Sequence, residues 1–79
     1  MKLKVISPES VVFEGEVDSV TLPGSMGGFT VLKNHASIIS TLTAGAIVYT
    51  PAGSSEEQRQ EIGGGLVDVD NNIISVCLY

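Results

Sequence analysis

The sequence predicts an all-β protein, a single-domain β-sandwich or flattened barrel of 79 residues. Nine glycines and three prolines, spread along the whole chain, divide it into segments of strand length rather than helix length. In several segments apolar and polar residues alternate, which is the pattern of a strand with one buried face. The expected strands are residues 2–7, 9–14, 16–22, 28–33, 36–44, 46–50, 56–62, 66–70 and 73–79.

The alternation is clearest near the two ends of the chain. The rows expected to face inward are Leu3 with Val5, Val67 with Val69, and Ile74 with Val76 and Leu78. Between the last two strands, Asn71 and Asn72 suit a two-residue hairpin turn, since asparagine tolerates the positive φ angles of such turns. Cys77, which lies between two apolar residues, is expected to be a small core residue.

The segment 16–22 contains an irregularity. Val17 lies at an odd position, whereas Val20 and Leu22 lie at even ones. Because side chains alternate strictly between the two faces of a strand, the inward face changes phase near Asp18 and Ser19. We expect a β-bulge or a bend there, where the strand turns a corner.

Two segments also carry helical signals. Apolar residues in 28–44 fit a helical stripe, but the window is rich in Thr, Val and Ile, whose branched Cβ favours strands. We predict strand, turn and strand there, with at most a single helical turn near His35. In 54–62, Ser54 and Glu57 resemble a helix-capping pair. Such a helix could bury only Ile62, so we expect an exposed hairpin arm instead.

Composition narrows the function classes. The chain carries four Lys or Arg and nine Asp or Glu, a formal net charge of −5, with no basic cluster. Nucleic-acid affinity rests on basic side chains that neutralise phosphates, so we expect no nucleic-acid partner. No apolar stretch approaches the ~20 residues that cross a bilayer, so we expect no direct membrane insertion. No signal peptide is recognisable, and a single cysteine favours a reducing compartment.

Glycine-rich sequences occur twice. Residues 24–28, GSMGG, lack the Lys-Ser/Thr pair and the following helix of a phosphate-binding loop, and are interpreted as a turn between strands. Met26, at the tip of this turn, is not needed for a core and is a candidate partner contact. Residues 63–65 are all glycine, open a strand, and are expected to let another backbone approach closely.

No catalytic, metal or cofactor site is predicted. Asp68, Asp70 and Asn72 match the first positions of a calcium loop, but its glycine and its final glutamate are missing. His35, the only histidine, and one distant cysteine cannot build a zinc site. A structural or partner-contacting role for His35 is favoured over catalysis, because no Gly-x-Ser-x-Gly elbow is present. The residues themselves predict a rigid protein-interaction domain.

The run FEGEVDSVTLPGSMGGFTVLKNHASIISTLTAGAI resembles the core of the ε-subunit family of the F-type ATP synthase. The matching positions are Gly15, Val17, Ser19, Val20, Leu22, Pro23, Gly24, Val31, Leu32, His35, Ala36, Leu42 and Gly45. Residues 63–69, GGGLVDV, resemble the family's S-G-G-x-x-E-V strand, and the Asn-Asn turn and a last strand follow in order. The resemblance covers residues 1–79 and matches them to the family's N-terminal β-sandwich domain.

The resemblance implies a ten-stranded β-sandwich that performs no chemistry and needs no cofactor. Such a domain belongs to the central stalk, where it binds the γ subunit and docks on the c-ring, coupling ion flow to ATP synthesis. The residues assigned by position to the c-ring contact are Gly24, Ser25, Met26, Gly27 and Gly28. Those assigned to the γ contact are Ser7, His35, Ser40 and Leu42. The implied location is peripheral, on the cytoplasmic face of the bacterial inner membrane.

Four positions depart from the family pattern. Met26 and Gly28 stand where acidic residues are common, Asn34 replaces the usual glycine before the histidine, and Ser37 replaces a common proline. We therefore expect the loop to make its contact through backbone and Met26 rather than through charge.

Length is a further departure, because most bacterial members continue into a pair of α-helices that restrains ATP hydrolysis. The chain ends at Tyr79, where the sandwich is expected to end, so we expect no helical domain and no inhibition by a helical hairpin from these residues. A naturally short chain and a shortened one both stay open.

Two other function classes stay open. A lipoyl or biotinyl carrier domain would use Lys33 in its turn as the modified residue, although Leu32 and Asn34 do not match the settings typical of carrier lysines. A small hydrolase would depend on His35 and would lose its turnover in the His35→Ala variant.

Overall fold

The computed structural model describes residues 1–79 as eight β-strands, and no helix in it is long and apolar enough to cross a membrane. The strands are β1 (Lys2–Ile6), β2 (Val11–Leu22), β3 (Phe29–Leu32), β4 (Ile38–Leu42), β5 (Gly45–Pro51), β6 (Gln58–Ile62), β7 (Gly65–Asp70) and β8 (Ile73–Leu78). The all-β, single-domain prediction is confirmed. The count is eight rather than nine or ten, in part because the segments expected at 9–14 and 16–22 are one continuous strand, β2.

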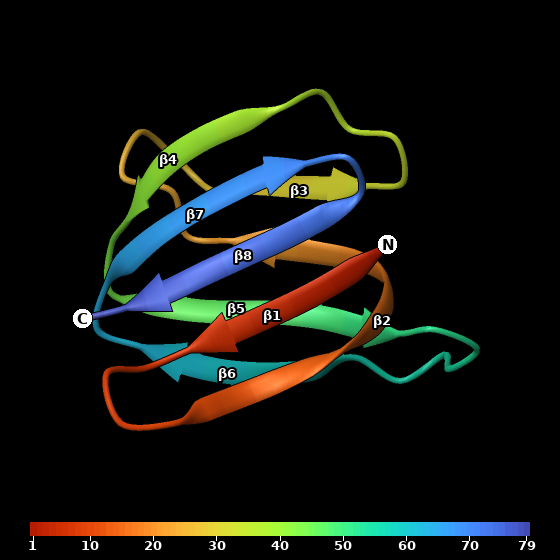
Figure 1. Cartoon of the computed structure of the whole chain (residues 1–79), viewed down its shortest axis with the longest axis horizontal. Coiled ribbons are helices and arrows are strands. Elements are labelled where there is room, and N and C mark those ends of the chain that lie inside the picture. Colours follow the sequence, from red (N-terminus) through yellow and green to blue (C-terminus); the bar gives the residue numbers. More distant parts are fainter.

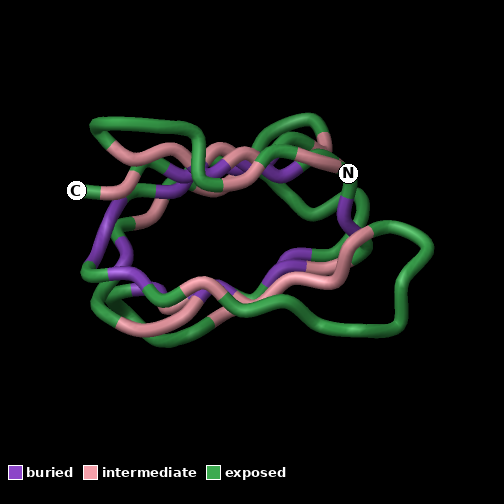
Figure 2. The backbone as a smooth tube through the Cα atoms, turned by 90° about the horizontal axis from the view of Figure 1, so that it is seen from below, coloured by how far each residue is buried: buried purple, intermediate pink, exposed green.

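The strands form two layers (Figure 1). The first layer has the order β4-β7-β8-β1-β2, and in the second layer β2 lies between β3 and β5, with β6 beyond β5. All pairs are antiparallel except β1 and β8, which run parallel with Lys2 opposite Ile73 and Ile6 opposite Cys77. Seen from the edge, the two layers face each other (Figure 2). Since β2 belongs to both layers, it joins them.

The strand β2 changes layer at the place where the sequence pattern changes phase. Its first half pairs with β1, and its second half pairs with β3 and β5. The register against β5 shifts between Val17 and Ser19, and Val17 and Val20 are both buried. The predicted bulge near Asp18 and Ser19 is therefore confirmed. The extra residue lets one strand send side chains into the core from both layers.

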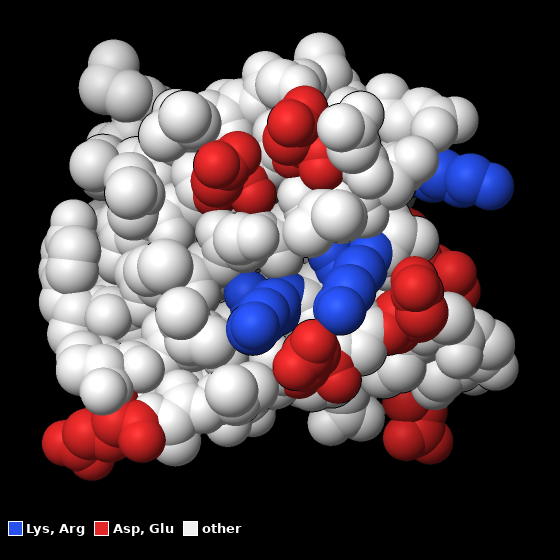
Figure 3. Space-filling view, in the orientation of Figure 1, with Lys and Arg blue, Asp and Glu red and all other residues white.

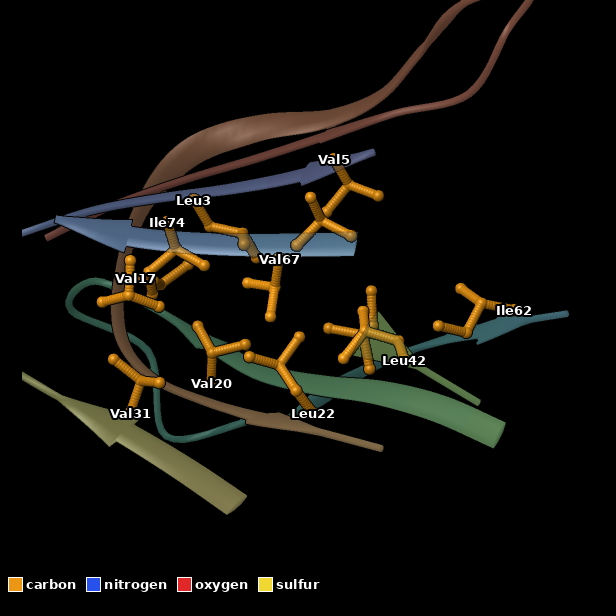
Figure 4. Close-up of a cluster of buried hydrophobic side chains, with 13 residues drawn as sticks. Leu3, Val5, Val17, Val20, Leu22, Val31, Leu42, Ile62, Val67 and Ile74 are labelled. Carbon is orange, nitrogen blue, oxygen red and sulfur yellow. The ribbon is translucent and has the colours of Figure 1, made fainter. Parts of the chain in front are cut away.

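The core fills the space between the layers (Figure 4). It contains 13 buried hydrophobic residues, and no polar or charged residue is buried. Valine, leucine and isoleucine side chains from the two layers point toward each other, and each fully buried one stabilises the fold by roughly 1.5–3 kcal/mol. In β7 the alternation is complete, with Val67 and Val69 buried and their neighbours Leu66, Asp68 and Asp70 exposed. A packed core of apolar side chains makes a stiff body.

The turns follow the sequence signals. Asn71 and Asn72 close the β7–β8 hairpin with φ angles of 49° and 60°, as predicted. Residues 28–44 form strand, turn and strand, and no helical turn forms at His35, because Asn34 before it takes a left-handed φ of 66°. Residues 52–57 form the exposed arm that precedes β6.

The triple glycine allows the predicted close backbone approach. A Cβ on Gly65 would lie 2.6 Å from the carbonyl oxygen of Cys77 in the neighbouring strand β8. Gly64 has a φ of 144°, and a Cβ on it would lie 3.3 Å from the carbonyl oxygen of Leu42 and from the ring of Tyr79. The sequence interpretation is confirmed for Gly64 and Gly65, whereas a Cβ on Gly63 would meet no atom within 4 Å.

Cys77 is a correction, because it is exposed rather than part of the core. Ile74 and Val76 point inward, so the alternation of β8 places Cys77 on the outward face. The usual burial of cysteine suggested the core, whereas the period of two already indicated the surface.

Candidate interaction surfaces

The glycine-rich loop of residues 24–28 connects β2 to β3 and is held against the end of β4. The hydrogen bonds that hold this segment run from Ser25 N to Thr41 O, from Thr43 N to Pro23 O and from Thr41 Oγ1 to Ser25 Oγ, at 2.9, 2.9 and 2.8 Å. Met26, at the tip, is 99% exposed. The loop therefore has an anchored base and a free apolar tip.

Two glycines give this loop its shape. A Cβ on Gly24 would lie 2.6 Å from the Gly27 carbonyl oxygen and 2.9 Å from the Phe29 ring, so only glycine fits there. Gly27 has a φ of 126°, a conformation that other residues rarely adopt. A strand follows the loop, so no helix N-terminus is present to hold a phosphate. The interpretation of residues 24–28 as a turn between strands is confirmed.

His35 lies in the exposed loop between β3 and β4. Its backbone N donates to the Leu32 carbonyl oxygen at 3.1 Å, and its ring Nδ1 lies 2.6 Å from the Ala36 carbonyl oxygen. Since a carbonyl oxygen only accepts, Nδ1 is the donor of this bond, and Nε2 makes no hydrogen bond within the chain.

The strand β4 carries Ser40 and Leu42, the two other residues assigned to this region. Ser40 is half-buried, and its hydroxyl donates to the Thr41 carbonyl oxygen at 3.0 Å. Leu42 is 4% exposed and belongs to the core, so it offers a partner no side-chain surface. Its backbone instead forms a bridge with Gly24 and supports the base of the glycine-rich loop.

Ser7 lies at the opposite end of the sandwich from His35. It follows the end of β1, where Ile6 is opposite Cys77, whereas the loop of His35 contacts Asn72, just before β8 begins. The six residues of β8 span about 20 Å at ~3.3 Å per residue. The structure therefore does not bring these residues into one small patch.

Charged side chains form stripes on the outward face of the first layer (Figure 3). Two lysines of β1 lie between acidic residues of β7 and of β2; the residues are Lys2 and Lys4, Asp68 and Asp70, and Glu14 and Glu16. Lys2 Nζ lies 3.0 Å from the carboxylate of Glu14. The hydrogen bond from Lys2, and then the charges of Lys2 and Lys4, hold the pKa of Glu14 below its ordinary value. Because the signs alternate, this face offers no large field of one charge.

At the Ser7 end, the same face carries an uncharged row, which the sequence analysis missed. Its residues come from five neighbouring strands and lie in register; they are Thr41, Leu66, Cys77, Ile6 and Val11. Leu66 and Val11 are 42% and 55% exposed. The signal was hard to find, because each strand contributes one residue and only the pairing aligns them.

A shallow, open depression of about 490 Å³ lies between β4 and β7, lined by Ser37, Ile38, Ile39, Asp68, Val69 and Asp70. The Ser37 hydroxyl donates to the Asp70 carboxylate at 2.7 Å, and no histidine lines the depression. No three His, Cys, Asp or Glu side chains converge to hold a metal ion. The lining therefore combines apolar side chains with one hydroxyl and two carboxylates.

The structure is thus a β-sandwich with a projecting glycine-rich loop and an uncharged row on its outward face. Comparison with known proteins gives its family. Residues 1–78 match the family described as ATP synthase, Delta/Epsilon chain, beta-sandwich domain, and the chain belongs to that family. The alternative of a carrier domain modified at Lys33 is not supported.

Proteins named ATP synthase epsilon chain are similar along most of the chain. The Leptospira interrogans protein is 40% identical over 76 residues, which are 96% of this chain and 58% of that protein. The Sulfurovum protein is 46% identical over 70 residues, covering 89% of this chain and 54% of its own length. The Rickettsia typhi protein is 38% identical over 77 residues, covering 96% and 70%. The chain thus spans little more than half of the first two relatives.

Solved structures show the same fold. A chain of the Euglena gracilis mitochondrial ATP synthase superposes with a TM-score of 0.87 at 19% identity, covering 96% of this chain and 48% of that chain. A chain in the central stalk and c-ring structure of the Tetrahymena thermophila mitochondrial ATP synthase gives a TM-score of 0.81 at 14% identity, covering 99% and 62%.

Proposed function

We propose that the chain is a non-catalytic rotor component of an F-type ATP synthase, which binds the γ subunit and docks on the c-ring and so couples ion translocation to ATP synthesis. The observation that carries this proposal is the family match over residues 1–78. The identity of 40% to an ATP synthase epsilon chain over 96% of this chain supports it. The closed core supports it too, because transmitting torque needs a body that does not deform.

The c-ring contact is proposed for the glycine-rich loop, residues 24–28. Its base is fixed to β4 by backbone hydrogen bonds, and Met26 stands free at the tip. The loop carries no charged residue, so the contact would use the Met26 side chain and exposed backbone groups. An unbranched methionine side chain adapts readily to a partner surface.

The γ contact is proposed for His35 and Ser40, with Ser7 as a second point of contact. Because Ser7 lies about one strand length, ~20 Å, from the His35 loop, a γ surface that touches both must run along the strands. Leu42 would contribute indirectly rather than by direct contact with γ. Its side chain packs in the core, and its backbone forms a bridge with Gly24.

The proposed location is the cytoplasmic face of the bacterial inner membrane, where the partners would hold the chain. Its net charge of −5 is unfavourable for anionic lipid headgroups, and the face shown in Figure 3 alternates in charge and has no basic patch. Attachment would therefore depend on γ and the c-ring, and not on the lipid.

Gel filtration of the chain with the cognate γ subunit tests the first half of the proposal. We expect a 1:1 complex that elutes ahead of either component, and separate elution of the two proteins would overturn it.

The c-ring half is tested by retention of the γ complex on detergent-solubilised c-ring. Met26→Ala removes the exposed tip and is expected to weaken retention roughly tenfold, since burying such a side chain contributes about 1.5 kcal/mol or more. Leu32→Ala is the matched control, because Leu32 is 58% exposed but belongs to β3 and not to the loop. Equal retention of both variants and the unaltered chain would refute the loop assignment.

A further inference from the structure

The β3–β4 loop, which carries His35, is tied to the β7–β8 hairpin by three side-chain hydrogen bonds. Asn34 N donates to Asn72 Oδ1 at 2.6 Å, and Asn72 Nδ2 donates back to Asn34 Oδ1 at 3.0 Å. Ser37 Oγ donates to Asp70 Oδ1 at 2.7 Å. We call these three bonds the loop clasp. It joins segments more than 30 residues apart in sequence, at the end of the molecule where β3 stops and β8 begins (Figure 1).

The clasp brackets His35 on both sides. Asn34 precedes it directly and Ser37 follows two residues later, so both flanks of the histidine are fixed to the hairpin. Within this bracket the loop makes only local bonds, from His35 N to Leu32 O and between the His35 ring and Ala36 O. Without the clasp, an exposed loop of this length would have to be ordered when a partner binds, which lowers affinity.

Both asparagines have a backbone role and a side-chain role, and the two can be separated. Asn34 and Asn72 have φ angles of 66° and 60°, which glycine also adopts freely. The Asn72 amide accepts through Oδ1 and donates through Nδ2 across the clasp, and glycine can do neither.

We propose that Asn72 is a positioning residue for the γ contact: through the clasp it holds the β3–β4 loop in the conformation that presents His35. This inference rests on the proposed function, in which His35 contacts γ. Asn72 itself lies in a hairpin turn, and its side chain touches the β3–β4 loop.

The test uses Asn72→Gly with Asn71→Gly as its matched control. Both positions have positive φ in the same turn, so glycine suits either one, but only the Asn72 side chain takes part in the clasp. We expect Asn72→Gly to weaken binding to the γ subunit by roughly three- to tenfold and to speed hydrogen exchange of the Asn34 amide. Asn71→Gly is expected to change neither, and the melting temperatures of the two variants are expected to agree within a few degrees.

Two further variants keep the result specific. Asn72→Asp retains the acceptor for the Asn34 N–H but loses the return bond, so its γ affinity should fall between those of the unaltered chain and Asn72→Gly. Asn34→Gly removes only the return bond from Asn72 Nδ2 to Asn34 Oδ1, because the Asn34 backbone N–H remains. Since Asn72→Gly already removes that bond, the double variant should bind γ no more weakly than Asn72→Gly alone.

The outcomes separate this inference from the proposed function. If His35→Ala weakens γ binding while Asn72→Gly does not, the γ contact stands and the positioning role is refuted. If His35→Ala leaves γ binding unchanged, the His35 contact fails and the positioning role fails with it. Additive losses in the Asn34→Gly, Asn72→Gly double variant would show that the two residues act separately, which also refutes the clasp.

Discussion

The substitution Gly65→Ala should destabilise the fold sharply, because β7 approaches β8 most closely at this residue. The added Cβ would lie 2.6 Å from the Cys77 carbonyl oxygen and 3.3 Å from the Leu78 Cα. These are backbone atoms inside a paired strand, so they cannot rotate away as the end of a side chain can. The strain can be relieved only if β7 and β8 move apart at the Gly65–Leu78 pair.

The magnitude follows from the cost of overpacking. Forcing a methyl group into a filled site costs typically 1–3 kcal/mol, and a contact with backbone belongs at the upper end of that range. For a domain of this size each kcal/mol lowers the melting temperature by about 4–8 °C. We therefore expect Gly65→Ala to lower the melting temperature by roughly 10–20 °C.

Gly63→Ala is the matched control for this experiment. A Cβ at Gly63 meets no atom within 4 Å, and Gly63 is not among the glycines with positive φ. Alanine there should leave the stability unchanged or raise it by about 0.4–1 kcal/mol, because it restricts the unfolded chain. Thermal melts and urea unfolding, both followed by circular dichroism, measure the two variants. If Gly65→Ala unfolds within about 0.5 kcal/mol of Gly63→Ala, the close approach of β7 and β8 is refuted.

Two other predictions concern the outward face of the first layer. Because the pKa of Glu14 is lowered, its pairing with Lys2 stabilises the fold at pH values above the ordinary glutamate pKa of about 4.3. This contribution is lost as the pH falls through the lowered pKa of Glu14 in the folded chain. Glu14→Gln should therefore have a lower free energy of unfolding than the unaltered chain at pH 7 and the same one near pH 2, as measured by urea unfolding. If the two free energies differ more near pH 2 than at pH 7, the pairing is contradicted. Cys77 should react with a thiol reagent in the folded chain nearly as fast as in 8 M urea, and Cys77→Ser should change the free energy of unfolding by less than about 0.5 kcal/mol. Protection of the thiol until the chain unfolds would show that Cys77 is buried.

Features that depend on neighbouring residues were predictable from the sequence. The phase change between Val17 and Val20 located the bulge in β2, because the alternation of a strand is a local rule. The Asn71-Asn72 turn and the constrained glycines Gly64 and Gly65 were recognised because positive φ angles and close approaches restrict the residue type.

Features that depend on which face of a strand packs against the core were harder to predict from the sequence. The strand β4 has the sequence IISTL, with isoleucine at two adjacent positions, so alternation does not say which face is inward. Leu42 was assigned to the γ contact from the family resemblance alone, and the structure buries it. The distance between Ser7 and His35 was also outside local reasoning, since it depends on the direction of β1 and β8.

The sequence by itself determined that the chain is all-β and where its strands turn and bend, because alternation, glycine and asparagine act over a few residues. Its motifs also showed which family it resembles. Only the tertiary structure decided that β1 lies parallel to β8, that five strands align one uncharged row, and that Asn72 reaches Asn34. These arrangements join residues tens of positions apart. Their register is set by packing the whole core at once, which no local pattern records.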